Sequence, residues 1–373
     1  MNGVAPNPEH FPPGGRRIAF SVSLLGTACD RTLRARFPGT VLAVFRRSFY
    51  VEMESGSLVC IGAPGLGAGP LNGICALPEG FDWEAAGLLP GAAVRWAGQE
   101  LRVGDRFVFT LRDAVVWGPP APPRATSRED LVNRLSRGLA RLAAECPGRT
   151  PAEGFAPLVL PLTGLQGGAF PGRESANPLL TGPLLSGPLL TGPALNNALL
   201  KVAREGIAGI VGWLKASLSG DRAALTTVPS VLTTVPPALE SLIGLGPGLT
   251  PSGDDFLGGV MIALHAMDHG TAAERLAGWV LPLARERTSP ISLAHLACAA
   301  QGEGSGALHE ILLRIMGGEG EPEQSLALAS WGECLDAVDA IGHTSGWDAL
   351  AGIAATLATV CATRVRSPHD SQN

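Results

Sequence analysis

The feature that most constrains the fold of this chain is a change in hydrophobic period across one proline-rich segment. Before "WGPPAPPRATS" (117–127), apolar and polar residues alternate, which is the period of β-strands. After it, apolar residues recur at helical spacing, as in Ile207, Ile210, Val211 and Leu214. The four prolines start no regular element. The sequence therefore predicts an α+β protein, with a mostly antiparallel, barrel-like β domain followed by a mainly α-helical domain.

Two hairpins are expected in the first part. "SFYVEMESGSLVCIG" (48–62) alternates on both sides of a turn at Ser55-Gly56, and "LRVGDRFVFTLRDAVVW" (101–117) does so around Gly104-Asp105. The stretch "RRIAFSVSLLGTAC" (16–29) faintly resembles a signal peptide, but its apolar part is short, so we interpret it as a first buried strand or helix. About five to seven strands are expected in this domain.

The expected boundaries are a disordered arm at 1–17, a β-rich domain at 18–117, a proline-rich linker at 118–127 and a helical domain at 128–373. Two duplications, "PLLTGPLLSGPLLTGPALNN" (178–197) and "TTVPSVLTTVPPAL" (226–239), are interpreted as loop expansions, because proline every fifth residue prevents a continuous helix. Helices are expected at about 128–145, 194–218, 254–269, 271–286, 289–301, 305–317, 323–341 and 347–364.

Composition excludes several classes of protein. The net charge of −5 argues against a nucleic-acid binder, which would carry a basic stripe. The seven cysteines are scattered and form no CxxC pair, so we expect buried thiols in a reducing cytoplasm and neither a disulfide framework nor a zinc site. No apolar run reaches the roughly 18 residues of a membrane span, so no membrane segment is expected.

A glycine-rich junction is the main candidate site. "GLGPGLTPSGDDFLGG" (244–259) places six glycines, two prolines and two aspartates before an apolar helix that should bury Phe256, Leu257, Val260, Met261 and Leu264 and stop at Gly270. Glycine backbone lets a ligand approach closely, and a helix N-terminus attracts anions. We expect binding by Gly246, Gly248, Thr250, Ser252 and Gly253.

The two acids of this junction leave several roles open. Asp254 and Asp255 diverge by about 100° on a helix, so only one should face the loop. That carboxylate could orient a substrate, hold Mg²⁺ beside a phosphate, or cap the helix. The structural alternative is a tight loop in which Ser252 caps the helix and Asp255 completes a capping box, or in which Thr250 caps and Pro251 is the first helical residue.

Two further polar clusters precede helices. "GHTSGWD" (342–348) offers His343, Thr344 and Ser345, where histidine could polarise a carbonyl. The alternative is that Ser345 and Asp348 form a capping box and His343 is a surface residue. "RERTSPISLAH" (285–295) offers an anion site at Arg287, Thr288 and Ser289, or else a basic helix end followed by a capped helix. A metal held by His265 and His269 is not expected, because HExxH is absent.

These motifs together carry a resemblance to a known family. "GLGPGLTPSGDDFLGG", "TSPIS" and "GHTSGWDAL" follow, in this order, a β domain with "VLAVFRRSFYVEMESGSLVCIG" and "GPLNGICAL". In this the chain resembles the AllH family over about residues 28–362. The two proline-containing duplications look like departures from that family, and the Ser-Thr-Arg-Thr phosphate loop of aspartate and ornithine carbamoyltransferases is absent.

The resemblance implies a subunit of oxamate carbamoyltransferase, which converts carbamoyl phosphate and oxamate to oxalurate and phosphate, reversibly, in allantoin breakdown. It implies partner subunits similar to AllF and AllG. In such a reaction the glycine-rich helix start could cradle phosphate, Arg287 with Thr288 could add charge-assisted bonds, and His343 could polarise the carbonyl. The expected catalytic residues are Asp254, Asp255 and His343.

Two other functions stay open from the sequence. One is a non-catalytic partner that binds a ligand and regulates a catalytic neighbour. The other is a Mg²⁺-dependent phosphoryl-transfer enzyme that uses Asp254 or Asp255, although no GxxxxGK[ST] loop is present.

Overall fold

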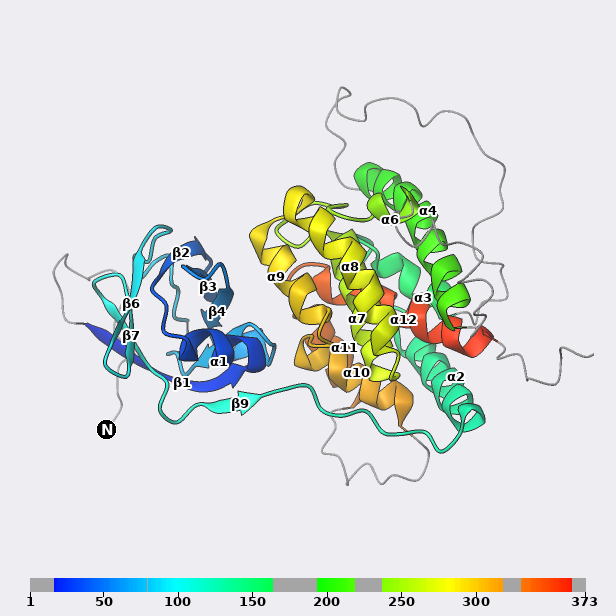
Figure 1. Cartoon of the computed structure of the whole chain (residues 1–373), viewed down its shortest axis with the longest axis horizontal. Coiled ribbons are helices and arrows are strands. Elements are labelled where there is room, and N and C mark those ends of the chain that lie inside the picture. Colours follow the sequence, from blue (N-terminus) through cyan, green and yellow to red (C-terminus); the bar gives the residue numbers. More distant parts are fainter. Residues whose placement is uncertain (1–16, 79, 164–192, 219–236, 318–329, 364–373) are drawn as a thin grey trace, which may run out of the picture. The chain divides into compact units, whose positions relative to one another are not determined.

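A computed structural model describes residues 17–78, 80–163, 193–218, 237–317 and 330–363. Its contacts divide the chain into two compact units. The first runs to Pro120 and includes Glu303–Ala307, and the second takes the rest from Ala121 onward. The first unit is a β-barrel and the second is helical (Figure 1). The predicted α+β class and the order of its two parts are therefore confirmed.

The first unit is a closed barrel of eight strands. The hydrogen-bonded order is β5-β4-β3-β2-β6-β7-β8-β1, and pairing between β1 and β5 closes the ring. A ninth strand, β9, pairs with β1 at the edge. The prediction of five to seven strands was too low, because strands of three to five residues are too short to show a clear alternation. The strands are β1 Ile18–Gly26, β2 Gly39–Val44, β3 Ser48–Met53, β4 Leu58–Gly62, β5 Asn72–Cys75, β6 Ala93–Ala97, β7 Glu100–Val103, β8 Phe107–Thr110 and β9 Val115–Trp117.

Both predicted hairpins are present. Strands β3 and β4 pair antiparallel with Val51 opposite Val59, and β7 and β8 pair antiparallel with Leu101 opposite Phe109. Alternation along these strands places one face inside the barrel. The sequence pattern therefore predicted both the pairing and the face that is buried. The helix α1, Thr27–Arg34, which follows β1, was not predicted.

Aromatic rings fill the barrel. Trp83 is fully buried, and its ring centroid lies 4.9 Å from that of Phe49 and 5.3 Å from that of Phe20. The rings of Phe81, Phe107 and Phe109 surround it at similar distances. Edge-on aromatic contacts of this kind add to the stabilisation from apolar burial, so this cluster is the centre of the barrel core.

The second unit consists of helices whose positions agree closely with the periodicity. Residues 178–192 and 226–236 of the two duplications, and the predicted arm before residue 17, lie outside the described residues. The ends of the duplications, 193–197 and 237–239, are helical and belong to α4 and α6, so the loop interpretation was wrong there. Three short helical elements near 156–162 and 237–240 were not expected. The elements are α2 Arg128–Glu145, η2 Ala156–Leu158, α3 Val159–Leu162, α4 Pro193–Leu218, α6 Pro237–Glu240, α7 Ser252–Ala266, α8 Gly270–Arg287, α9 Pro290–Ala299, α10 Gly306–Met316, α11 Trp331–Asp339 and α12 Ser345–Ala362.

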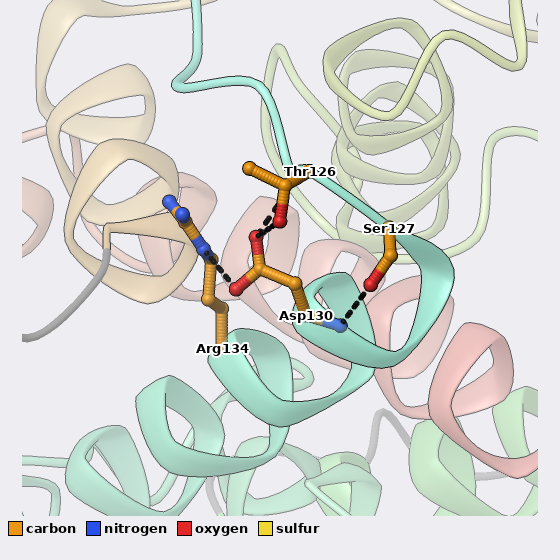
Figure 2. Close-up of polar contacts among 4 residues, drawn as sticks. All are labelled: Thr126, Ser127, Asp130 and Arg134. Carbon is orange, nitrogen blue, oxygen red and sulfur yellow. Dashed lines mark hydrogen bonds and ion pairs between the residues drawn. The ribbon is translucent and has the colours of Figure 1, made fainter.

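The start of α2 shows how a helix begins directly after the proline-rich segment (Figure 2). The Ser127 side chain accepts a hydrogen bond from the Asp130 backbone N–H at 3.1 Å. The Asp130 carboxylate in turn accepts bonds from Thr126 and from Arg134 Nε at 2.8 Å. The bond from Arg134 is the main reason that the pKa of Asp130 is lowered to about 2. This cap fixes the helix start at the predicted residue.

Helices α7 and α12 cross with their backbones in contact at the middle of the helical unit (Figure 1). A Cβ atom on Gly259 would lie 2.0 Å from the carbonyl oxygen of Ala349, and one on Gly352 would lie 2.0 Å from that of Phe256. Only glycine allows so close a crossing. Nearly all residues of both helices are buried, which includes the five apolar residues predicted for α7. The crossing therefore fixes the first turn of α7 against the first turn of α12.

Helix α7 ends at Ala266, three residues earlier than predicted, and Gly270 begins α8 instead. Asp268 lies between the two helices with φ = 59°, in the left-handed region that aspartate tolerates better than most residues. The N–H groups of Asp268 and His269 donate back to the carbonyls of His265 and Leu264, which closes the end of the helix before the glycine is reached.

Candidate functional site

Asp254 joins three segments at the start of α7. Its Oδ1 accepts a bond from the Gly244 N–H at 2.8 Å, and its Oδ2 accepts bonds from the hydroxyls of Thr288 at 2.5 Å and Ser292 at 2.7 Å. The residue is 1% exposed. Both oxygens of this buried carboxylate are therefore hydrogen-bonded. Asp254 holds the glycine-rich loop and the start of α9 in place.

The glycine-rich loop is also tied to the segment between α8 and α9. Ser289 caps α9 by accepting a bond from the Ser292 N–H at 3.0 Å, and it donates one to the Leu249 carbonyl at 2.5 Å. Gly244 has φ = +74°, and a Cβ there would lie 2.5 Å from the Arg287 carbonyl oxygen. Glycine at this position therefore allows the two backbones to approach closely, and the "TSPIS" segment packs against the loop.

The start of α12 meets the same loop from the other side. The hydroxyls of Thr250 and Ser345 lie 2.7 Å apart. Asp348, which is fully buried, accepts bonds from the Phe155 N–H at 2.5 Å and the Thr344 hydroxyl at 2.8 Å. Burial raises the pKa of Asp348 to about 6, although these bonds and one with Ser252 act in the opposite direction. Three segments far apart in sequence therefore meet at the start of α7.

Asp255 lies between these groups and differs from the other two acids. Its Oδ2 is enclosed, yet among the described residues it has no hydrogen-bond partner. Burial raises the pKa of Asp255 well above its ordinary value, and the charge of Asp348 raises it further. Hydroxyls of Ser345 and Thr250 bond to Asp255 and lower this pKa in part. Of the three acids, only Asp255 has an oxygen left for a ligand.

The arrangement is suited to a particular kind of chemistry. A carboxyl group with a raised pKa takes up a proton at a pH where an ordinary aspartate stays ionised. Three acids in close proximity favour a ligand group that carries N–H bonds and disfavour a group that carries negative charge. The start of α7 is therefore a better place for an amide or amine than for a phosphate.

Most of the sequence-predicted site residues are brought together here. The contacts described above include Thr250, Ser252, Thr288, Ser289, Thr344 and Ser345, together with Asp254 and Asp255. Gly246 has φ = +122°, and a Cβ there would lie 2.8 Å from the Ser252 nitrogen, whereas a Cβ on Gly248, with φ = +95°, would meet open space. The loop is thus tight near Ser252 and open at Gly248.

Two predicted residues are not brought to the aspartates. The His343 side chain is 79% exposed, and its Nε2 lies 3.2 Å from Glu153 Oε2. Arg287 pairs with Glu240 at 3.1 Å, on a surface where both side chains are about 40% exposed. Both arrangements agree with the structural alternatives, a surface histidine and a basic helix end. The sequence could not separate a site role from the structural alternative for His343 or Arg287, because both residues lie next to motif residues that do converge.

Three capping interpretations need correction. The residue that precedes α7 is Pro251, whose carbonyl accepts bonds from the N–H groups of Asp254 and Asp255, so Ser252 is the first helical residue and not the cap. Thr344, and not Ser345, precedes α12. Asp255 and Asp348 were interpreted as cap partners, but neither α7 nor α12 has a side-chain cap, and Asp348 accepts bonds from the Thr344 hydroxyl and from the Phe155 N–H.

Gly253 has a different role from the one predicted. Its N–H donates to the Leu245 carbonyl at 2.9 Å, and a Cβ there would lie 1.9 Å from the Leu242 carbonyl oxygen. It allows the loop to pack against the helix and does not offer its N–H to a ligand. The contacts of Asp348 and Ser292 within the site were not predicted from the sequence. Asp348 could have been noticed because it is an acid in a helix with almost no other polar residue.

The metal interpretation of the paired histidines finds no support in their positions. His265 Nε2 lies 3.0 Å from the Ala300 carbonyl oxygen, and His269 lies beyond the end of α7, so the two are not one turn apart on one helix. In the described ranges, no group of three histidine, cysteine, aspartate or glutamate side chains is arranged to hold a metal ion.

One described helix, α12, is long and apolar enough to cross a membrane by length and composition. It is mostly buried inside the helical unit, as expected for the core helix of a globular protein. The seven cysteines are free thiols, and six of them are buried.

Comparison with known proteins agrees with the fold and the motifs. The family described as oxamate carbamoyltransferase subunit AllH matches residues 242–357, which include all the predicted site residues, and the AllH family N-terminal domain matches residues 18–116, which form the barrel. No curated protein and no solved structure gives a significant match. With both of its units matched in order, this chain belongs to the AllH family.

Proposed function

We propose that this chain is a subunit of a carbamoyltransferase of the oxamate type, which acts in the cytoplasm in the breakdown of allantoin and other purine nitrogen. The amide nitrogen of oxamate would attack the carbamoyl carbon of carbamoyl phosphate. As the new C–N bond forms, the C–O bond to phosphate breaks and the amide nitrogen loses a proton. Oxalurate and phosphate are the products, and the reverse reaction yields carbamoyl phosphate. The family description supports the subunit role.

The single observation that carries the site assignment is the unpartnered Oδ2 of Asp255 beside the hydroxyls of Thr250 and Ser345. An amide nitrogen is a weak nucleophile, and it must lose a proton as it attacks. Asp255 is the group placed to accept that proton, because its raised pKa makes its ionised form a stronger base than an ordinary aspartate. General-base help of this kind contributes about 10²–10⁴-fold to a rate.

Asp254 and Asp348 have supporting roles in this proposal. Asp254 holds the loop by its three bonds. Asp348 raises the pKa of Asp255 through its charge. The phosphate of the second substrate would not lie against these acids, since two unit charges of like sign 4 Å apart repel by about 1–4 kcal/mol at a protein surface. We therefore propose that the phosphate does not bind at the glycine-rich helix start, where the sequence predicted it.

Partner subunits similar to AllF and AllG would complete the active site. The family description calls the member protein a subunit. The exposed edge of the loop, where Gly248 meets open space, is where we place the contact with a second substrate or a partner.

The second candidate is a non-catalytic subunit that binds a ligand and regulates its neighbour. The observation that favours it is the enclosure of Asp255 Oδ2, which a ligand reaches only after the loop moves. Its signature would be binding of oxamate or oxalurate without any effect of Asp255 on the rate of the chemical step.

The test is carbamoyl transfer by the full chain alone and then with its partner subunits, in the presence and absence of a chelator. The proposal expects activity only in the reconstituted enzyme. Asp255→Asn in this chain should reduce kcat, whereas Asp268→Asn, an exposed aspartate between α7 and α8, should not. Activity of the partner subunits that is independent of this chain would contradict the proposal, and complete loss with chelator would support the Mg²⁺ alternative.

A further inference from the structure

A cavity of about 730 Å³ lies on the outside of the barrel, over β6, β7 and β8. It is distant in sequence from the site described above and belongs to the first unit. Its charged lining is one-sided, with four arginines and one aspartate: Arg17, Arg95, Arg102, Arg106 and Asp105. The volume falls within the range of small-molecule sites, about 300–1,000 Å³.

The strand register explains why two of the arginines converge. Val94 lies opposite Val103, and both are fully buried inside the barrel. The next pair along the two strands, Arg95 and Arg102, must therefore point outward and lie directly opposite each other. Like charges in directly opposite positions destabilise a sheet.

The other two arginines meet at the neighbouring strands. Ile18 of β1 lies beside Phe107 of β8 in a parallel pair, and the Ile18 N–H donates to the Arg106 carbonyl at 2.8 Å. Arg17 and Arg106 come directly before these two strands, and both line the cavity.

Between the two pairs lies Val108, which is opposite Arg102 and only 6% exposed although it is on the outer face. Arg95, Arg102 and Val108 therefore form one row across β6, β7 and β8 on the outer face, and Val108 lines the cavity together with the four arginines.

The pair of Arg95 and Arg102 is only partly neutralised. Arg102 pairs with Glu100 at 3.4 Å on the same strand, and Arg106 Nη1 donates to the Ala86 carbonyl at 2.9 Å, which fixes its direction. In the part of the chain that the structure describes, no acidic side chain lies within ion-pair distance of Arg95. An anion between these groups would remove the repulsion that the register creates.

We propose that this arginine-lined cavity is a binding site for a small molecule that carries a phosphate group. Arginine presents a planar set of donors that fits phosphate oxygens in pairs. The cavity also has an apolar side at Leu89 and Pro90, which would contact the organic part of such a molecule. The size of the cavity favours a small ligand over an acidic segment of another protein, which would need a longer surface.

The experiment measures binding by the full chain with calorimetry at low salt. The probes are inorganic phosphate and phenyl phosphate, which distinguish the anion alone from an anion with an organic body. Arg95→Glu is the main variant, because Arg95 is exposed and its loss leaves the barrel core intact. Arg95→Gln is the milder variant, and Arg112→Glu, an exposed arginine of the same unit that does not line this cavity, is the matched control. Circular dichroism confirms that each variant is folded.

The proposal expects binding of phenyl phosphate that weakens at least tenfold in Arg95→Glu and less in Arg95→Gln. Binding should be unchanged in Arg112→Glu and should weaken steeply with added salt. Equal affinity in Arg95→Glu and Arg112→Glu, or no binding of either probe at millimolar concentration, would overturn it. So would binding of polyglutamate that depends on Arg95 when both phosphates fail. The readout does not involve carbamoyl transfer, so it is independent of the proposed function.

Discussion

The hydroxyls of Thr250 and Ser345 lie 2.7 Å apart, although 95 residues separate them in the sequence. This contact joins the glycine-rich loop to the first turn of α12 beside Asp255. It exists because α7 and α12 cross at their glycines, which brings both helix starts to one place. The hydrogen bonds of Asp254 then join the start of α9 to the same place. The site is therefore built by helix packing, and it depends on the helical unit as a whole.

The adjacent aspartates should respond in opposite ways to the same substitution. Asp254→Asn replaces one oxygen with an NH₂ group that faces a donor, so it should lower the free energy of unfolding by about 2–3 kcal/mol. Asp255→Asn removes a buried charge that has no full set of partners, so stability at pH 7 should stay equal or rise. Urea unfolding of both variants gives the comparison. Equal destabilisation by the two substitutions would mean that Asp255 is a structural acid like its neighbour.

The pH dependence of stability should reveal Asp348. Its pKa in the folded protein is about 6, above the ordinary value of 3.8. Its contribution to stability is therefore complete below about pH 4 and is lost as the pH rises through 6. A shift of about two pKa units corresponds to about 3 kcal/mol.

Asp348→Asn should flatten this part of the profile, measured as the free energy of unfolding between pH 4 and 7. The pKa of Asp255 is also raised, so its contribution to stability falls with rising pH in both proteins. The test therefore compares the slopes of the two stability profiles. An unchanged slope in the variant would show that Asp348 does not titrate in this range.

The helix crossing predicts a contrast between two glycines. Gly259→Ala places a Cβ about where the Ala349 carbonyl oxygen lies, so it should destabilise the helical unit by about 1–3 kcal/mol or more. Gly278→Ala, within α8, meets no atom within 4 Å and should stabilise by about 0.5–1 kcal/mol, because alanine is the better helix former. Thermal melting distinguishes them. If both substitutions stabilise, then α7 and α12 do not cross at their backbones.

Much of the architecture could be predicted from the sequence because it depends on the regular spacing of apolar residues along strands and helices. The helix from Arg128 and the hairpin turns at Gly56 and Gly104 follow directly from alternation, capping and turn residues. Barrel closure could not be predicted, since the pairing of β1 with β5 joins segments about fifty residues apart and leaves no local pattern. The domain boundaries at 17, 117 and 127 remain predictions, and the contact-based units divide after Pro120.

The sequence identified the motifs that converge at the start of α7, but not the contacts that each residue makes there. Spacing could show that Asp254 and Asp255 point in different directions, but it could not show which of them has hydrogen-bond partners on both oxygens. That depends on Thr288 and Ser292, which belong to another helix start. His343 and Arg287 were included because they lie within the same motifs, and only the fold shows that their side chains point to solvent and to Glu240. The catalytic and binding roles of the predicted residues remain predictions.

The most direct test of the central claim, that Asp255 accepts a proton from the attacking amide, is kcat for carbamoyl transfer by the reconstituted enzyme with Asp255→Asn, beside Asp268→Asn as the control. Loss of a general base should reduce kcat by about 10²–10⁴-fold, with stability equal to or above that of the unmodified protein. Asp268→Asn should leave kcat unchanged. Full activity of Asp255→Asn, in an enzyme that is folded and assembled, would contradict the claim.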